Sequence, residues 1–208
     1  MTPHEPSYRI PNLVIALRVA LAFVAAALLL AGSVAAAGVA VALIALVIAM
    51  DALDGIVARR LGVTSKLGGV LDITADRIVE HVFWITFAVA HVVGLWVPLV
   101  VMTRSFLVDA ARGLALAQGR TAFGAESMAR SPISRFLTAS RAMRNLYGGA
   151  KVAAFVLLGL LVVAERIGAP AHLLGAAAGA SVLVAVALCL ARGIPVLLDA
   201  RTYLPSAH

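Results

Sequence analysis

Residues 50–77 of the chain read MDALDGIVARRLGVTSKLGGVLDITADR. Four aspartates stand in this stretch, between two strongly apolar segments: Asp51, Asp54, Asp72 and Asp76. Residues three or four positions apart on a helix project from the same face, so the first two aspartates form one pair and the last two another. With a turn around the GVTSKLG sequence, the pattern predicts two antiparallel helices whose ends bring both pairs together.

The composition on either side of this stretch is that of a membrane protein. Of 208 residues, 62% are hydrophobic and 13% are charged, which excludes an ordinary soluble domain. Apolar runs of the roughly 20 residues that cross a bilayer occur six times, at Pro11–Gly32, Ala35–Leu53, Leu67–His91, Leu95–Gln118, Tyr147–Ala164 and His172–Leu198. We therefore expect an all-α integral membrane protein. Residues 1–208 should form a single membrane-embedded domain, a six-transmembrane-helix bundle with a short N-terminal interfacial segment.

Basic residues are concentrated in two of the expected connections. Arg59, Arg60 and Lys66 lie between the second and third runs, and five arginines lie between the fourth and fifth. The positive-inside rule directs both connections to the cytoplasm. We expect the inner (cytoplasmic) membrane of a bacterium, an active site that faces the cytoplasm, and no nucleic-acid partner. The first run could instead be a secretory signal that ends at GSVAAAG, but Arg18 interrupts it and it is longer than such signals.

Two residues stand out within the apolar runs. An unpaired cation inside a span costs at least about 2.5 kcal/mol, so we expect Arg18 to face the other helices and to pair with a carboxylate. The single cysteine, Cys189, lies in the last run, where we interpret it as a small packing residue.

A short basic segment follows the RSPIS sequence, before the fifth run. It is typical of an amphipathic helix at the membrane surface, with Phe136, Leu137 and Met143 toward lipid.

The four aspartates of residues 51–76 require a positive partner. Converging carboxylates repel one another in a medium of low dielectric constant unless cations neutralise them. Oxygen ligands without His or Cys favour Mg²⁺ or Mn²⁺, and a pair of such ions suits chemistry on a phosphoryl group. Room for a bulky ligand is left by four small residues, Gly55, Ala58, Gly68 and Gly69. The guanidinium of Arg59 can donate two parallel hydrogen bonds to phosphate oxygens. Ordinary helix-end charges that pair with nearby basic residues are the alternative, which suits one pair better than four clustered carboxylates.

The spacing matches every fixed position of the signature D-x2-D-G-x2-A-R-x8-G-x3-D-x3-D. The matching residues are Asp51, Asp54, Gly55, Ala58, Arg59, Gly68, Asp72 and Asp76. On this signature the chain resembles the CDP-alcohol phosphatidyltransferases. The resemblance implies an enzyme that transfers a phosphatidyl-type group from CDP-diacylglycerol or a similar lipid to an alcohol, releasing CMP in phospholipid biosynthesis.

The resemblance also implies a role for each matched residue. The four aspartates would hold two Mg²⁺ or Mn²⁺ ions on the diphosphate, and Asp76 would also be the general base for the acceptor hydroxyl. Gly55 and Ala58 would border the cytidine, Arg59 would lie near the diphosphate, and Gly68 would permit close helix approach.

Two motifs bear on the alcohol. The opening IPNLVIALRVALAF resembles the phosphatidylglycerophosphate synthases, which use glycerol 3-phosphate, whereas LDITADRIVEHVFW is closer to the branch that uses inositol phosphate. We expect a phosphorylated polyol, glycerol 3-phosphate first and inositol 1-phosphate second. Its phosphate requires cations, and the candidates are Arg104, Arg112, Arg141, Arg144 and Lys151, with Arg135 beside them. Snorkelling or ion pairing, for example with Asp109, is the alternative for several of these.

Other membrane functions fit less well. An intramembrane prenyltransferase needs aspartate motifs on helices well separated in sequence. An ion-coupled transporter needs carboxylates near the bilayer centre and two pseudo-repeated halves, which the sequence lacks. We also expect the protein to be a homodimer surrounded by membrane lipids.

Overall fold

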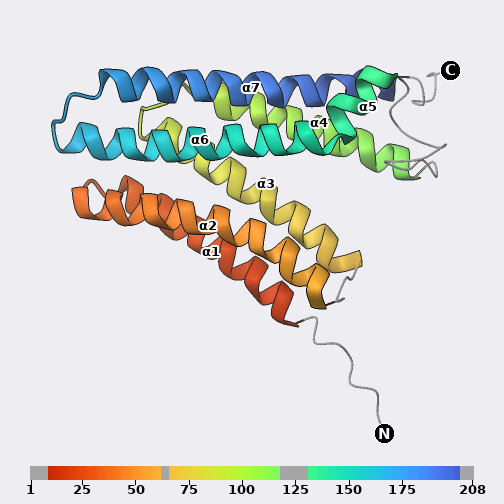
Figure 1. Ribbon diagram of the computed structural model, residues 1–208, viewed down its shortest axis with the longest axis horizontal. Coiled ribbons are helices and arrows are strands. Elements are labelled where there is room, and N and C mark those ends of the chain that lie inside the picture. The colour runs from red at the N-terminus through yellow and green to blue at the C-terminus, as the bar shows by residue number, and fades with distance from the viewer. Residues whose placement is uncertain (1–8, 62–65, 118–130, 202–208) are drawn as a thin grey trace, which may run out of the picture. The chain divides into compact units, whose positions relative to one another are not determined.

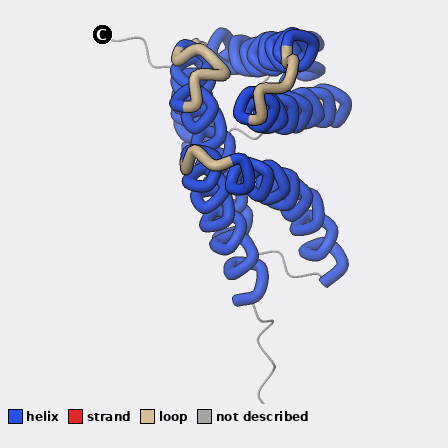
Figure 2. The backbone as a smooth tube through the Cα atoms, turned by 90° about the vertical axis from the view of Figure 1, so that its left-hand side faces the viewer, coloured by secondary structure: helices blue, strands red, loops and turns tan. Residues whose placement is uncertain are grey.

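The computed structural model describes residues 9–61, 66–117 and 131–201, and within these ranges it contains helices and no strand (Figure 1). The helices are α1 (Arg9–Leu30), α2 (Val34–Leu61), α3 (Lys66–Val89), α4 (Trp96–Ala117), α5 (Pro132–Ala139), α6 (Arg141–Arg166) and α7 (His172–Ala200). Figure 2 shows short loops between several of these helices. The all-α class expected from the composition is confirmed.

Four of the helices are long and apolar enough to cross a membrane. The candidate spans are Asn12–Leu30, Val34–Asp51, Arg141–Arg166 and His172–Ala200. α3 and α4 have 24 and 22 residues, but every stretch of 18 residues in either helix includes at least three charged side chains. The structure therefore supports an integral membrane protein, and the assignment of α3 and α4 as further spans stays a prediction.

The chain divides into two compact units, Met1–Leu95 with Phe155–Gly175, and Trp96–Ala154 with Ala176–His208. In the first unit α1 packs against both α2 and α3. The buried face of α1 runs through Arg18, Ala22, Ala25 and Leu29, each exposed by 1% or less. This spacing of three and four residues is one stripe of a helix, and its alanines let the neighbouring backbones approach closely. Arg18 is thus directed inward by the same stripe that packs the helix.

The last residue of α6 donates hydrogen bonds to the turn between α1 and α2. Gly32 has a φ of +83°, which a glycine adopts without strain, and Ser33 Oγ accepts a 3.1 Å hydrogen bond from the N–H of Ala36. Arg166 donates 2.6 Å and 3.0 Å hydrogen bonds to the carbonyl oxygens of Leu29 and Ser33. The bond to Leu29 satisfies a carbonyl group that the end of α1 would otherwise leave open, whereas the carbonyl of Ser33 also accepts a hydrogen bond from the N–H of Ala37.

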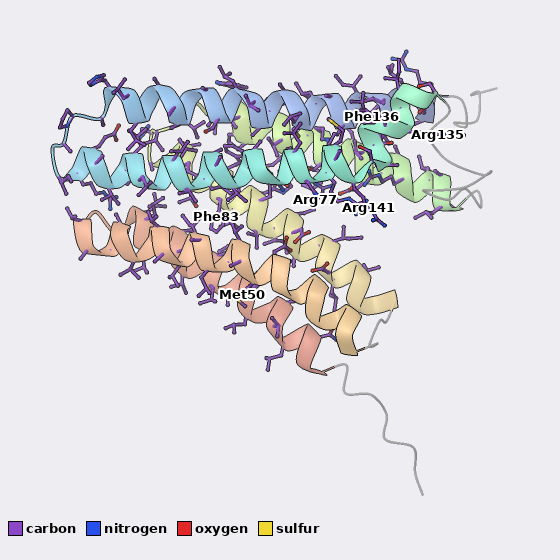
Figure 3. The ribbon with its side chains drawn as sticks, in the orientation of Figure 1. Met50, Arg77, Phe83, Arg135, Phe136 and Arg141 are labelled. Atoms are coloured by element: carbon purple, nitrogen blue, oxygen red, sulfur yellow. The ribbon has the colours of Figure 1, made fainter. Side chains whose placement is uncertain are left out.

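Aromatic contacts join α3 to the second half of α6. The ring of Phe155 lies 4.8 Å from that of Trp84, 5.4 Å from that of Phe83 and 6.0 Å from that of Phe87, measured between centroids. All four side chains are buried, and Phe83 is labelled in Figure 3. This cluster anchors the part of α3 that lies beyond the aspartates.

The second unit has a small apolar core. Val108, Ala111 and Ala115 of α4 pack with Val196 and Ala200 of α7. Cys189 of α7 is fully buried, which confirms its interpretation as a packing residue.

The short helix expected after RSPIS corresponds to α5, which begins earlier than expected, at Pro132 within that sequence. Ser131 caps its first turn, and Ser134 donates a 2.6 Å hydrogen bond to Asp199 of α7. Phe136 is 56% exposed, as an outward residue should be, and is labelled in Figure 3. The expectation for Met143 is wrong, because this residue belongs to α6 and is only 8% exposed.

Candidate metal centre

Arg18 connects three of the aspartates in the first unit. Its Nη1 contacts Oδ1 of Asp51 on α2, and its Nη2 lies 2.6 Å from Oδ1 of Asp76 and 3.3 Å from Oδ1 of Asp72, both on α3. Met50 and Arg77, labelled in Figure 3, mark the neighbouring positions on these two helices. The expected pairing of Arg18 with a carboxylate is confirmed.

The carboxylates converge as their spacing predicts. One oxygen from each of Asp51, Asp72 and Asp76 lies within 4.8 Å of the others. Asp72 and Asp76 are one helical turn apart, and Asp51 comes from the other helix of the pair. About half of each aspartate side chain is exposed, at 47% to 51%, whereas Arg18 is 1% exposed. The carboxylates thus form an accessible group with a buried cation beneath it.

The donor set and its spacing fit a hard divalent cation. Mg²⁺ binds oxygen ligands at about 2.0–2.1 Å in an octahedron, so its ligands lie about 3 Å apart when adjacent and about 4.2 Å apart when opposite. Oxygens that are within 4.8 Å of one another need movements of about an ångström to reach these values. Side-chain rotation at Asp51, Asp72 and Asp76 suffices for such movements.

Other signature residues are only partly described. Asp54, Gly55, Ala58 and Arg59 lie on α2, but their side chains are outside the described part of the structure. Gly68 lies on α3 and is partly buried.

The neighbouring glycine supports the expected space beside the aspartates. A Cβ atom at Gly69 would meet no atom within 4 Å, so α3 borders open space at this position.

Arg77 has a partner on its own helix. Its Nη1 lies 3.7 Å from a carboxylate oxygen of Glu80, which is 3% exposed. This ion pair gives Arg77 a structural role next to the last aspartate of the signature.

The candidate acceptor residues all belong to the second unit. Arg104 of α4 is 7% exposed, and Arg112 of α4 is partly buried. Lys151 of α6 is also partly buried, and its Nζ lies 4.7 Å from the centroid of the Tyr147 ring. Arg135 of α5 and Arg141 and Arg144 of α6 are exposed.

One further cation was not anticipated from the sequence. The guanidinium of Arg192 on α7 lies 5.5 Å from the centroid of the Tyr147 ring, and its charge interacts with those of Arg104, Arg112 and Arg144. Arg192 stands in the last apolar run, so the argument that singled out Arg18 would also have found it.

Three buried donors of this unit have no hydrogen-bond acceptor among the described residues. They are Nε of Arg104, Nε of Arg192 and the hydroxyl of Ser105. Arg104 packs so closely on α7 that a Cβ atom at Gly193 would lie 2.4 Å from its Nε. Buried positive donors without acceptors are suited to an anion.

A sequence profile of the CDP-alcohol phosphatidyltransferase family matches residues 8–204. The match covers almost the entire chain and includes the aspartates on α2 and α3. No curated protein and no solved structure shows significant similarity to the chain.

Proposed function

We propose that this chain, which belongs to the CDP-alcohol phosphatidyltransferase family, transfers a phosphatidyl group from CDP-diacylglycerol to glycerol 3-phosphate and releases CMP. Family membership defines the reaction class: the protein is a transferase of phospholipid biosynthesis that uses a CDP-linked alcohol, an alcohol acceptor and a divalent metal. The transporter and prenyltransferase alternatives are thereby rejected. The observation that carries the proposal is the convergence of Asp51, Asp72 and Asp76, whose carboxylate oxygens lie within 4.8 Å of one another.

The aspartates have two roles in this proposal. Asp51, Asp54, Asp72 and Asp76 would hold two Mg²⁺ or Mn²⁺ ions, which when bound neutralise the diphosphate and stabilise CMP as the leaving group. Asp76 also serves as the general base. Its partly exposed carboxylate accepts the proton of the acceptor hydroxyl as that oxygen bonds to the lipid-side phosphorus. The bond from this phosphorus to the oxygen of CMP breaks in line with the attack.

Signature residues outside the metal set position the nucleotide lipid. Gly55 and Ala58 border the cytidine because they lack bulky side chains, and Arg59 binds the diphosphate through its guanidinium. Gly68 allows the start of α3 to approach its neighbour closely. Open space beside Gly69 leaves room for the nucleotide lipid near the aspartates.

The acceptor assignment rests on electrostatics. A dianionic acceptor needs cations to bind it, and the candidates are Arg104, Arg112 and Lys151, together with Arg192. The buried Nε atoms of Arg104 and Arg192 have no hydrogen-bond acceptor among the described residues, which supports a phosphate ligand. Arg141 and Arg144 add exposed positive charge at the start of α6. Inositol 1-phosphate, which has the same phosphomonoester group, is the second candidate.

The setting of the enzyme is also part of the proposal. Residues 1–208 form one membrane-embedded domain in which α3 and α4 join the four apolar helices as spans. The basic connections, and with them the active site, face the cytoplasm of a bacterial inner membrane. The protein functions as a homodimer.

An acceptor screen tests the proposed substrate. Purified protein in CDP-diacylglycerol vesicles receives Mg²⁺ and one alcohol at a time, and the product lipid is identified by mass spectrometry. Glycerol 3-phosphate should yield phosphatidylglycerophosphate at the highest kcat/KM, with inositol 1-phosphate next. Turnover with serine, free inositol or ethanolamine and none with either phosphorylated polyol would reject the assignment.

A further inference from the structure

We infer that Arg18 is a counter-ion of the metal centre. Its guanidinium holds Asp51, Asp72 and Asp76 together in the metal-free protein, and divalent ions that bind there displace it from their oxygens. The inference rests on the metal centre of the proposed function. It adds a residue from α1 to a site whose signature lies between residues 51 and 76.

The contacts of Arg18 match those of a shared cation. Two guanidinium nitrogens reach three carboxylates on two other helices, including Oδ1 of Asp76 at 2.6 Å and Oδ1 of Asp72 at 3.3 Å. A metal ion on these oxygens must therefore compete with Arg18 for their lone pairs. One positive charge offsets only one of three negative charges, so the carboxylates still attract a divalent ion.

The burial of Arg18 keeps its charge beside the carboxylates even when a metal ion takes their oxygens. Its side chain is 1% exposed and belongs to the packed stripe of Ala22 and Ala25, so the guanidinium cannot withdraw into water. The charge stays close to any bound metal and opposes it, because like charges repel strongly in a buried site. Arg18 should therefore weaken metal binding while it stabilises the metal-free protein. A purely structural residue would have only the second effect.

Mn²⁺ binding separates the two effects. Purified protein in detergent is titrated with Mn²⁺ by calorimetry, and its Tm is measured in EDTA and in Mn²⁺. Arg18→Gln should lower the Kd for Mn²⁺ on the order of tenfold, because it removes a nearby positive charge. It should also lower the Tm in EDTA, with a larger recovery in Mn²⁺ than the wild type shows. Arg18→Lys keeps the charge and should stay within about threefold of the wild-type Kd.

Arg166→Gln is the matched control, because it removes another arginine whose contacts cross between helices of the same unit. Arg166 donates to backbone carbonyls of Leu29 and Ser33, and Leu29 lies about 16 Å along α1 from Arg18 at 1.5 Å per residue. Its loss should lower the Tm equally in EDTA and in Mn²⁺ and leave the Kd unchanged.

The outcomes distinguish this inference from the proposed function. Wild-type protein that binds no Mn²⁺, or binds it equally well after Asp72→Asn, would reject the metal centre itself. Wild-type binding that Arg18→Gln leaves unchanged or weakens would reject only the counter-ion role.

Folding of the variant does not limit the test. An Arg18→Gln protein that folds in Mn²⁺ but not in EDTA supports the inference. If it folds in neither, NMR spectra of the wild-type protein labelled with ¹⁵N-arginine provide the test. The guanidinium resonance of Arg18 is identified as the one that is missing from the spectrum of Arg18→Lys. Addition of Mg²⁺ should shift this resonance in the wild-type protein. An unshifted resonance would overturn the inference.

Discussion

Nη2 of Arg18 donates a 2.6 Å hydrogen bond to Oδ1 of Asp76 across 58 positions of the sequence. The contact joins α1 to α3, while Nη1 of the same guanidinium joins α1 to Asp51 on α2. The first helix is therefore part of the framework of the candidate metal centre, although the family signature lies on the next two helices.

Removal of a metal ligand should abolish activity. We expect Asp51→Asn, Asp54→Asn and Asp72→Asn each to lower kcat/KM more than about a hundredfold, since the loss of a supporting partner alone costs 10- to 100-fold at metal sites. Initial rates of CMP release in Mg²⁺ measure this effect. Glu165→Gln is the control, because this carboxylate lies near the far end of α6 and should retain full activity. Near-normal turnover of any of the three variants would argue against the assigned ligands.

Asp76 should differ from the other ligands if its base role dominates. Asp76→Asn keeps the shape of the side chain but cannot accept the proton of the acceptor hydroxyl. Turnover should be lost, while CDP-diacylglycerol still binds with a Kd within about tenfold of the wild type. Equilibrium binding of a labelled CDP-lipid provides the measurement. Retained turnover would show that another group takes the proton.

The sequence predicts the aspartate cluster well because the helical spacing alone directs Asp72 and Asp76 to one face. It also predicts that Arg18 must find a carboxylate, since an unpaired cation is costly in a span. It could not identify which carboxylates Arg18 contacts, because that depends on how α1 packs against α2 and α3. It also could not show that Met143 lies on α6 and is buried.

Helix ends differ from the predicted spans for a physical reason. The second apolar run ends at Leu53, yet α2 continues to Leu61, and α6 begins at Arg141 rather than at Tyr147. Hydropathy identifies only the apolar segment of a helix that can lie in the lipid core. The backbone hydrogen bonds of the helix can continue beyond that segment through charged residues. The polar extensions carry residues of both proposed sites.

The orientation in the membrane can be tested by cysteine labelling. Ser65→Cys and Ser127→Cys place nearly isosteric thiols in the two basic connections, in a Cys189→Ala background that removes the single native thiol. Both should resist a membrane-impermeant maleimide in intact cells and react after permeabilisation, because the positive-inside rule places them in the cytoplasm. Gly94→Cys should react in intact cells. The reverse pattern would overturn the topology.

The acceptor site should respond to loss of its cations. We expect Arg112→Ala or Lys151→Ala to raise the KM for glycerol 3-phosphate about tenfold to a hundredfold, as loss of a charged phosphate contact worth about 1.5–3 kcal/mol implies. The KM for CDP-diacylglycerol should change far less. Arg201→Ala, which removes an exposed cation beyond the end of α7, is the control. Equal increases in both KM values would contradict a role specific to the acceptor.

The close approach of α6 to α2 should limit substitution at Gly159. A Cβ atom there would lie 2.9 Å from Cγ2 of Val41, so Gly159→Ala should lower the free energy of unfolding by about 1–3 kcal/mol. Val41→Ala in the same protein should restore most of the loss. Gly179→Ala on α7 meets no atom within 4 Å and should be neutral or stabilising. Unfolding in a denaturing detergent compares them, and equal stability of the two alanine variants would refute the packing.

The central claim is that this chain forms a phospholipid by metal-dependent transfer from a CDP-linked lipid. Its most direct test is CMP release by the purified protein in vesicles that contain CDP-diacylglycerol. CMP should appear in a one-to-one ratio with phosphatidylglycerophosphate when glycerol 3-phosphate and Mg²⁺ are both present, and neither product should form in EDTA or with Asp72→Asn. CMP release at an undiminished rate in EDTA, or none with any alcohol in Mg²⁺, would contradict the account.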